Sequence, residues 1–458
     1  MTSPARRPPA PLLADRSSDE YQPVPRRPVD RHVDQILAGV DDDASQRLSI
    51  DPGTYFASRL GTAATLGALN DAHGETFYDV TVEATIDQGA ADEVFASAGP
   101  VIDVQTHLVR PSRATTQAAD ALFGFLRMVD PDRWSEPIDL SQLSAPAWAA
   151  CVFGGSETSV ALLTSTPGES GTNVIDNADI AAAREIMDRY AGSGRVLGHT
   201  IVHPNLGAAE LDAMESWRND LKPAGWKVYT LWDPPETPGQ GWFLDDERWG
   251  IPFLERVQAL GPHIVCAHKG IAGPIPAAAP AAASPRDIGP AAARFPDIQF
   301  VVYHSGYDVD VTGEEGAHED DPQRGVSRLV TSLTNAGITP GSNVWAELGS
   351  TWFLMLRRPR EAAHVLGKLL LAVGPERILW GTDSIWYGPP QLLIDAFRAF
   401  TIPEAMQEQY GYPALTRAVK AAILGANATR LYGIDVPPQP IDNAALAEAR
   451  AELSRRLA

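Results

Sequence analysis

Short apolar runs recur along the chain from about residue 100 and alternate with longer stretches of helical character. Most of these runs are rich in β-branched or aromatic residues and apolar on both faces, which is the pattern of strands buried in a parallel sheet. We therefore predict eight strands, at residues 101–104, 149–153, 196–202, 226–229, 263–266, 298–303, 344–348 and 378–380. The helices expected between them include residues 182–190, 208–217, 252–260 and 361–373.

Strand–helix units repeated over residues 100–435 predict an α/β fold, a (β/α)8 TIM barrel. A doubly wound open sheet is the alternative. No Gly-x-Gly-x-x-Gly follows the first strand, which weakens a dinucleotide-binding version of that alternative.

Four segments flank or interrupt the predicted barrel. Residues 1–48 are rich in Pro, Arg and Asp, and we expect a flexible arm there. Residues 49–99 are expected to add a helical or extended embellishment, and residues 436–458 a C-terminal helix. Residues 273–285 are mostly Ala and Pro and are predicted to be a loop, either a plain connector or an active-site lid.

Composition and charge narrow the classes of function. The 458 residues are 44% hydrophobic and 21% charged, which is a normal globular balance. The formal net charge of −21 argues against general binding to nucleic acid or to an anionic membrane. Two cysteines cannot form a disulfide framework, and no apolar stretch reaches the length of a membrane span, so we expect a cytoplasmic enzyme.

Polar side chains gather where the predicted strands end, and in a barrel these ends converge on one mouth. The candidate metal ligands are Gln105, His107, Lys227, His268, His304, Glu347 and Asp383. Gln105 and His107 are two residues apart on one strand and can face the same ion. A single histidine at a strand end is more often structural. Imidazole and carboxylate groups converging from several strands instead predict a zinc, iron or manganese site.

The motifs at these strand ends resemble the amidohydrolase superfamily, and within it the metal-dependent TIM-barrel hydrolases and decarboxylases. The motifs are, in order, IDVQTH (102–107), CAHKG (266–270), YHSG (303–306), WGTDS (380–384) and the closing LGANATRLYGI (424–434). The resemblance implies that His107, His268, His304 and Asp383 form the metal site. It also implies that Lys227 occupies the place where some members carry a carboxylated lysine that bridges two metals.

Two positions depart from that family pattern. Gln105 stands where the family usually has the first histidine of a His-x-His pair, and Glu347 adds a carboxylate on the seventh strand. Both changes shift the ligand set toward oxygen, which favours iron, with two ions an option, or manganese over a plain zinc site.

The reaction therefore has several interpretations. The altered ligand set narrowly favours an oxygenase, and here the chain resembles the non-haem diiron monooxygenases of platensimycin and platencin biosynthesis. Those enzymes hydroxylate a CoA-linked diterpenoid in antibiotic biosynthesis. The alternatives are a hydrolase of a C–N, C–O or thioester bond, with Asp383 as general base, or a non-oxidative decarboxylase. A non-enzymatic binding protein is the remaining option. The expected catalytic residues are Asp383, His268, His304 and Lys227.

The substrate is expected to be a bulky, apolar small molecule, because aromatic residues are frequent near the predicted mouth. The weaker candidates for substrate contacts are Tyr229, Trp232, His203, Trp352 and Trp386. The arginines at 357, 358 and 360 leave open a CoA-linked substrate, although such a run is usually a solvated helix face. A homodimer is the default assembly for a chain of this size.

Overall fold

The computed structural model describes residues 10–14, 16, 25–113, 126–127, 134, 139–166, 168, 173–233, 239, 241–272, 279–309, 313–437 and 441–458. Eight parallel strands form one sheet in sequential order. They are β1 (Val101–Thr106), β2 (Thr158–Leu163), β3 (Val196–Ile201), β4 (Gly225–Tyr229), β5 (Ile264–His268), β6 (Gln299–Tyr303), β7 (Val344–Glu347) and β8 (Ile378–Leu379).

The sheet closes between β8 and β1. The amide of Val104 donates to the carbonyl of Trp380 at 3.0 Å, and the amide of Asp383 donates to the carbonyl of Gln105 at 2.9 Å. This closure confirms the predicted TIM barrel and places the chain segment after β8 against the end of β1.

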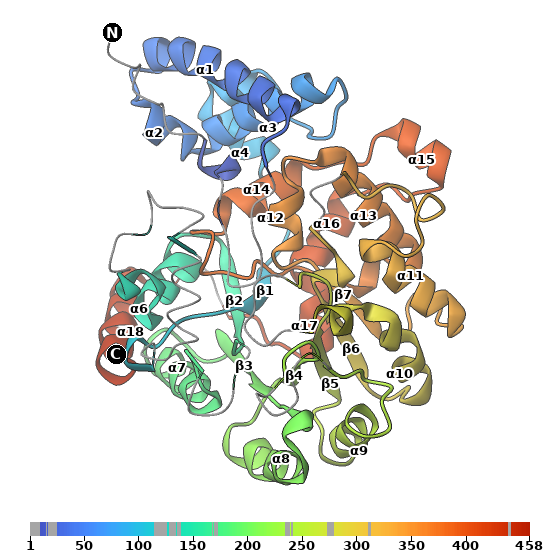
Figure 1. The fold of residues 1–458 in the computed structure, drawn as a ribbon. Helices are drawn as coiled ribbons and strands as arrows, with labels where there is room; N and C mark the ends of the chain where they lie inside the picture. The colour runs from blue at the N-terminus through green and yellow to red at the C-terminus, as the bar shows by residue number, and fades with distance from the viewer. Residues whose placement is uncertain are drawn as a thin grey trace.

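Helices surround the barrel and follow the strands in turn (Figure 1). They are α7 (Asn177–Tyr190), α8 (Ala208–Asp220), α9 (Gly250–Leu260), α10 (Ile288–Arg294), α11 (Gly325–Asn335), α12 (Thr351–Met355), α13 (Pro359–Ala372), α14 (Gln391–Ala399), α15 (Glu404–Tyr410), α16 (Arg417–Ala421), α17 (Asn427–Tyr432) and α18 (Asn443–Arg456). The predicted helices at 182–190, 208–217, 252–260 and 361–373 all lie in this ring, and α18 is the expected C-terminal helix.

One predicted strand is wrong. Residues 149–153 are helical: α6 (Ala145–Ala149) continues into a π-helical turn at Ala150–Gly154, and the second strand is Thr158–Leu163. Pro146 in the first helical turn favours the helix start. A short apolar run does not by itself distinguish a buried helix from a buried strand, and this explains the error.

Alternation along the strands decides which side chains enter the barrel. Cys266 belongs to the cluster inside the barrel, with Ile102, Val104 and Tyr303, so His268 faces inward two residues further along β5. On β4, Trp226 and Val228 pack in the outer core, which turns Lys227 to the interior. All of these side chains are buried.

The described part of the predicted N-terminal arm is largely helical. The expected arm contains α1 (Pro28–Leu48) and a short turn at Pro11–Leu13, where Leu12 and Leu13 are only 3% and 4% exposed. The segment that follows forms α2 (Pro52–Phe56), α3 (Arg59–His73) and α4 (Gln88–Val94), as the expected embellishment.

Helices α1–α4 lie together against the side of the barrel that carries α12 and α14 (Figure 1). The Tyr78 hydroxyl donates to the carbonyl of Leu356 at 3.1 Å, and the amide of Thr401 donates to the carbonyl of Phe77 at 2.7 Å. The N-terminal helices are therefore fixed to the β7–β8 side of the barrel.

The described part of the Ala/Pro loop forms two 3-10 turns, Pro280–Ala283 and Pro285–Asp287, while residues 273–278 lie outside the described residues.

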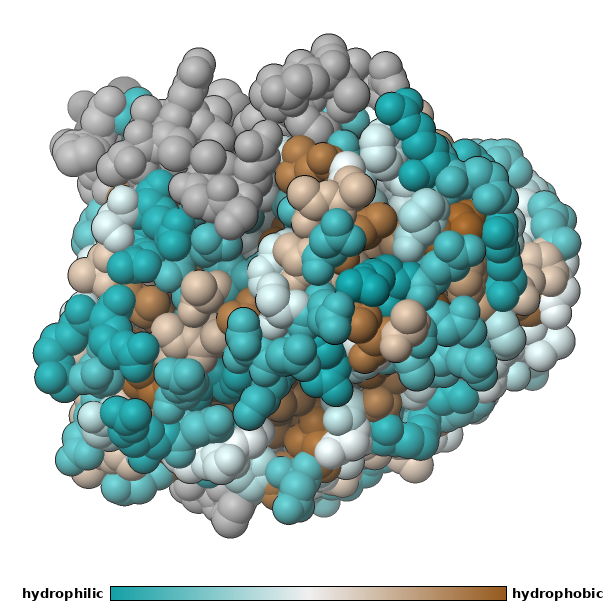
Figure 2. Space-filling view, turned by 90° about the horizontal axis from the view of Figure 1, so that it is seen from below, coloured by the Kyte–Doolittle hydropathy of each residue, from teal (hydrophilic) through white to brown (hydrophobic). Residues whose placement is uncertain are grey.

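On the face seen in Figure 2, hydrophobic residues are interspersed with hydrophilic ones. Among the described residues, no helix is long and apolar enough to cross a membrane.

Candidate active site

Asp383, which follows β8, is contacted by Gln105 and His107 from the end of β1. Gln105 Nε2 donates to Asp383 Oδ1 at 3.0 Å, and His107 Nε2 lies 3.0 Å from the same oxygen. All three side chains are at most 1% exposed. The hydrogen bonds that close the barrel hold these side chains together.

The position of the proton on the His107 ring determines how this contact is interpreted. His107 Nδ1 lies 3.0 Å from the carbonyl oxygen of Thr164, and a carbonyl only accepts, so the proton sits on Nδ1. Nε2 then carries the lone pair and lies 3.0 Å from Asp383 Oδ1, and no hydrogen bond forms between them. Two acceptors this close need a proton or a metal cation between them.

Glu347 supports the ends of β6 and β7. Its Oε2 accepts the amide of His304 at 3.0 Å, and its Oε1 accepts the amide of Gly349 at 2.5 Å. Burial raises the pKa of Glu347 to about 7, opposed by His304 and these amides. Each carboxylate oxygen accepts a hydrogen bond from a backbone amide, so Glu347 stabilises the backbone at the ends of β6 and β7. Its role as a metal ligand stays a prediction.

A second group of polar side chains lies next to Glu347. It consists of His268, His304 and Lys227. The rings of His268 and His304 are 4.7 Å apart, and His268 stacks on Tyr229. His304 Nδ1 donates to the carbonyl of Gly349 at 2.7 Å, and His268 Nε2 to that of Ile271 at 2.8 Å. Lys227 Nζ lies 3.4 Å from the centre of the Tyr303 ring.

Backbone strain is concentrated at the same edge of the barrel. Six non-glycine residues in the described part of the chain have a left-handed φ, and four of them follow β6, β7 and β8. They are His304, Ser305, Ser350 and Asp383, with φ between 52° and 61°. Each such residue costs about 1–3 kcal/mol, and such strain persists mainly at functional sites.

Sequence reasoning missed two residues that contact Asp383 directly or through a neighbour. The Ser350 hydroxyl donates to Asp383 Oδ2 at 2.5 Å, and since its proton is used there, the Tyr387 hydroxyl donates to Ser350 Oγ. A serine in a loop after a strand carries no specific signal in a single sequence.

The donor chemistry around Asp383 fits a divalent cation. His107 supplies an imidazole nitrogen, Asp383 a carboxylate, and Gln105 an amide oxygen that is buried and accepts no hydrogen bond from the described residues. Each imidazole is oriented by a backbone carbonyl, as is usual for metal-binding histidines. In the described ranges, however, no three His, Cys, Asp or Glu side chains are arranged as a preformed metal site.

The weaker candidates for substrate contacts fall in different places. Trp386 lies 6.5 Å from His107 between ring centres, and Tyr229 contacts His268. The rings of His203 and Trp232 pack 4.5 Å apart, and burial lowers the pKa of His203 to about 4, which keeps it neutral.

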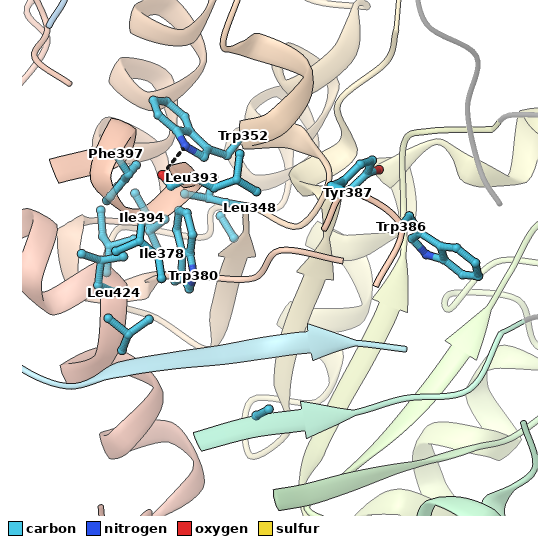
Figure 3. Packing of buried hydrophobic residues seen from close by; sticks show 14 of the residues in the cluster. Leu348, Trp352, Ile378, Trp380, Trp386, Tyr387, Leu393, Ile394, Phe397 and Leu424 are labelled. Atoms are coloured by element: carbon cyan, nitrogen blue, oxygen red, sulfur yellow. Dashed lines mark hydrogen bonds between the residues drawn. The ribbon is translucent and has the colours of Figure 1, made fainter. Parts of the chain in front are cut away.

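Trp352 is a packing residue rather than part of the mouth. Its indole donates to the carbonyl of Leu393 at 3.0 Å and packs edge-on against Phe397 (Figure 3). Figure 3 also shows Trp386 and Tyr387 set apart from this cluster.

Arg358 and Arg360 of the arginine run after β7 both pair with acidic residues of the protein, although about half of the Arg360 side chain is exposed. Arg358 pairs with Glu361 at 3.2 Å and is 4% exposed, and Arg360 pairs with Glu75. These contacts give no support to the expectation of a CoA-linked substrate.

Comparison with known proteins gives one family. The amidohydrolase family profile matches residues 102–434. No curated protein matches the chain.

Several solved structures are similar to the chain. A 2,6-dihydroxybenzoate decarboxylase in complex with 2,6-dihydroxybenzoate is 16% identical, and the match covers 73% of this chain and 100% of that one, with a TM-score of 0.44. A probable 2-pyrone-4,6-dicarboxylic acid hydrolase from Acinetobacter baumannii is 14% identical over 73% and 99%, with a TM-score of 0.45. A 5-carboxyvanillate decarboxylase from Novosphingobium aromaticivorans with bound manganese is 13% identical over 74% and 98%, with a TM-score of 0.46.

Proposed function

The chain belongs to the amidohydrolase family, and on that premise we propose that it is a metal-dependent hydrolase that acts on a carbonyl compound at the β1–β8 end of the barrel. The observation that carries the proposal is the approach of His107 Nε2 to Asp383 Oδ1 at 3.0 Å without a hydrogen bond. A shared cation accounts for this pair of facing acceptors.

The proposed ligands are His107 and Asp383, together with Gln105 once its amide group is turned so that the oxygen takes the place of Nε2. One imidazole with two oxygen donors favours manganese or iron over zinc. A divalent cation bound there would act as a Lewis acid toward a carbonyl oxygen and lower the pKa of water.

The protein groups supply orientation and proton transfer. Ser350 holds the second oxygen of Asp383, so that oxygen has a fixed direction. His304 carries its proton on Nδ1, toward Gly349, which makes Nε2 the basic nitrogen of the ring. We propose that His304 accepts or returns a proton during turnover and that the rings of Tyr229 and Trp386 exclude water from the site.

The oxygenase interpretation has less support than its alternatives. It relied on Gln105 and Glu347 as added oxygen ligands, but both oxygens of Glu347 are engaged by the amides of His304 and Gly349. The hydrolase and decarboxylase alternatives agree better with the family. A non-oxidative decarboxylase uses the same metal position, and the assay below separates it.

The test is a set of turnover assays with the protein purified without added metal and then loaded with manganese, iron or zinc. Amides, esters, thioesters and aromatic carboxylates are supplied in water labelled with oxygen-18. A hydrolase incorporates the label into the acid product and releases no CO2. CO2 release without the label identifies a decarboxylase, and consumption of O2 with a reductant identifies an oxygenase; either result overturns the hydrolase proposal.

A further inference from the structure

A cavity of about 420 Å³ lies outside the barrel mouth, between the N-terminal segment and the loops that follow β7 and β8. Leu12 and Arg16 line it from the N-terminal side, and Phe353 and Tyr387 from the barrel side. A volume of this size is within the range of small-molecule sites.

The barrel-side wall is flat and apolar. The rings of Phe353 and Tyr387 stack with centres 4.1 Å apart and planes 18° from parallel. Leu12 and Leu393 complete an apolar lining around them. Such a wall favours a planar ring, because offset stacking adds to the gain from burying its apolar surface.

The charged groups of the lining favour an anionic substituent on that ring. Arg59 pairs with Asp395 at 3.3 Å and also with Asp92 and Glu157, so its charge is compensated within the protein. Arg16 adds a further positive charge to the lining. A guanidinium group has five N–H donors and can bind an anion in addition to contacts within the protein.

Tyr387 connects this cavity with Asp383. Its ring forms the wall, while its hydroxyl donates to Ser350, and Ser350 donates to Asp383 Oδ2. A molecule that presses on the ring therefore acts on the same hydrogen-bonded chain that orients Asp383. Ser350 has a left-handed φ of 52°, so the loop that carries it is held in a conformation with little freedom.

We propose that this cavity is a second ligand site, for a planar aromatic carboxylate, and that its occupant restrains Asp383 through Tyr387 and Ser350. Leu12 and Arg16, from the described residues of the N-terminal segment, are part of this site. The proposal goes beyond the hydrolase function and does not depend on it.

The first experiment is calorimetric titration of the full-length protein, without added metal, with benzoate as the probe. We expect benzoate to bind with a Kd in the millimolar range or below. Benzamide lacks the charge and cyclohexanecarboxylate lacks the flat ring, and both should bind at least about fivefold more weakly, a difference of about 1 kcal/mol.

Substitutions assign the binding to the cavity. Phe353→Leu removes the stacked ring and should weaken benzoate binding at least about tenfold, and Leu12→Trp should block the cavity. Phe243→Leu, in a half-buried phenylalanine that does not line the cavity, is the matched control and should change nothing. His107→Ala disables the barrel site and should leave the Kd within about twofold of the original. The inference is wrong if benzoate does not bind, or if His107→Ala abolishes binding while Phe353→Leu does not.

The connection to Asp383 is tested by hydrogen–deuterium exchange with and without benzoate. In the original protein, benzoate should slow exchange at least about twofold in peptides covering 348–352 and 381–387. Tyr387→Phe keeps the ring but removes the hydroxyl, so it should bind benzoate normally without slowing exchange in 348–352. Unchanged exchange there in the original protein, with benzoate bound, contradicts the coupling.

Discussion

His107 and Asp383 meet across the closure of the barrel, with Nε2 and Oδ1 3.0 Å apart and both side chains almost fully buried. The two residues are far apart in the sequence but adjacent in space because the chain after β8 pairs with β1. The carbonyl of Thr164 fixes the proton of His107 on Nδ1, which leaves Nε2 as an acceptor 3.0 Å from the carboxylate. The pair is the centre of the proposed metal site.

His107→Ala and Asp383→Asn should each lower the affinity for manganese or iron more than about 100-fold, because each removes a direct ligand, and even outer contacts to ligands contribute 10–100-fold. Metal content after dialysis against a weak chelator is the measurement. His263→Ala is the matched control, since His263 is exposed just before β5. Full metal content in both site variants would exclude this assignment.

Gln105→His should shift the metal preference toward zinc. The substitution replaces an amide with an imidazole next to His107 and lowers the share of oxygen donors. We expect the ratio of zinc to manganese affinity to rise about tenfold in competition experiments. Gln323→His, at an exposed position, should leave the ratio unchanged. The same ratio in Gln105→His would mean that Gln105 is not a ligand.

Glu347→Gln tests whether Glu347 stabilises the backbone or binds the metal. The amide keeps one acceptor oxygen but cannot accept the amides of both His304 and Gly349, so one buried N–H loses its partner. The free energy of unfolding in urea should fall by about 1–3 kcal/mol. Metal content should not change. Loss of metal with unchanged stability would show instead that Glu347 is a ligand.

The sequence predicted the barrel but only part of the site. Seven of the eight strands were correctly located, because a strand buried on both faces is a short, continuous apolar run, and 149–153 failed because a buried helix can look the same. His107 and Asp383 lie together, as the sequence predicts, because strand ends converge in any such barrel, and their role in a metal site stays a prediction. The roles of Ser350 and Glu347 depend on distant hydrogen-bond partners, which a single sequence does not contain.

His364 should contribute to the pH dependence of stability. It is buried beside Tyr412, whose hydroxyl is 3.0 Å from Nδ1, and burial lowers the pKa of His364 from 6.5 to about 4. The unfolded chain therefore takes up the proton at a higher pH than the folded protein does. Stability is lost as the pH falls from 6.5 toward 4, by at most about 1.4 kcal/mol per pH unit from this residue.

Urea unfolding at pH 7, 6 and 5 measures this contribution. His364→Gln should flatten the decrease of the unfolding free energy with acidification, even if it lowers stability at pH 7. His263→Gln, at an exposed position, should keep the slope of the original protein. An unchanged slope in His364→Gln would exclude His364 as a source of the acid sensitivity.

Lys269 lies in the CAHKG motif beside His268 but has a structural role. Its Nζ pairs with Asp287 Oδ2 at 2.9 Å, both side chains are fully buried, and Asp287 also accepts the amide of Leu244. Lys269→Met leaves a buried carboxylate without its counter-charge and should cost about 3–5 kcal/mol of unfolding free energy. Adding Asp287→Asn removes that charge while an oxygen remains for Leu244, so the double variant should recover most of the loss. Metal content should stay normal in both variants; a metal-deficient but fully stable Lys269→Met protein would assign Lys269 to the metal site instead.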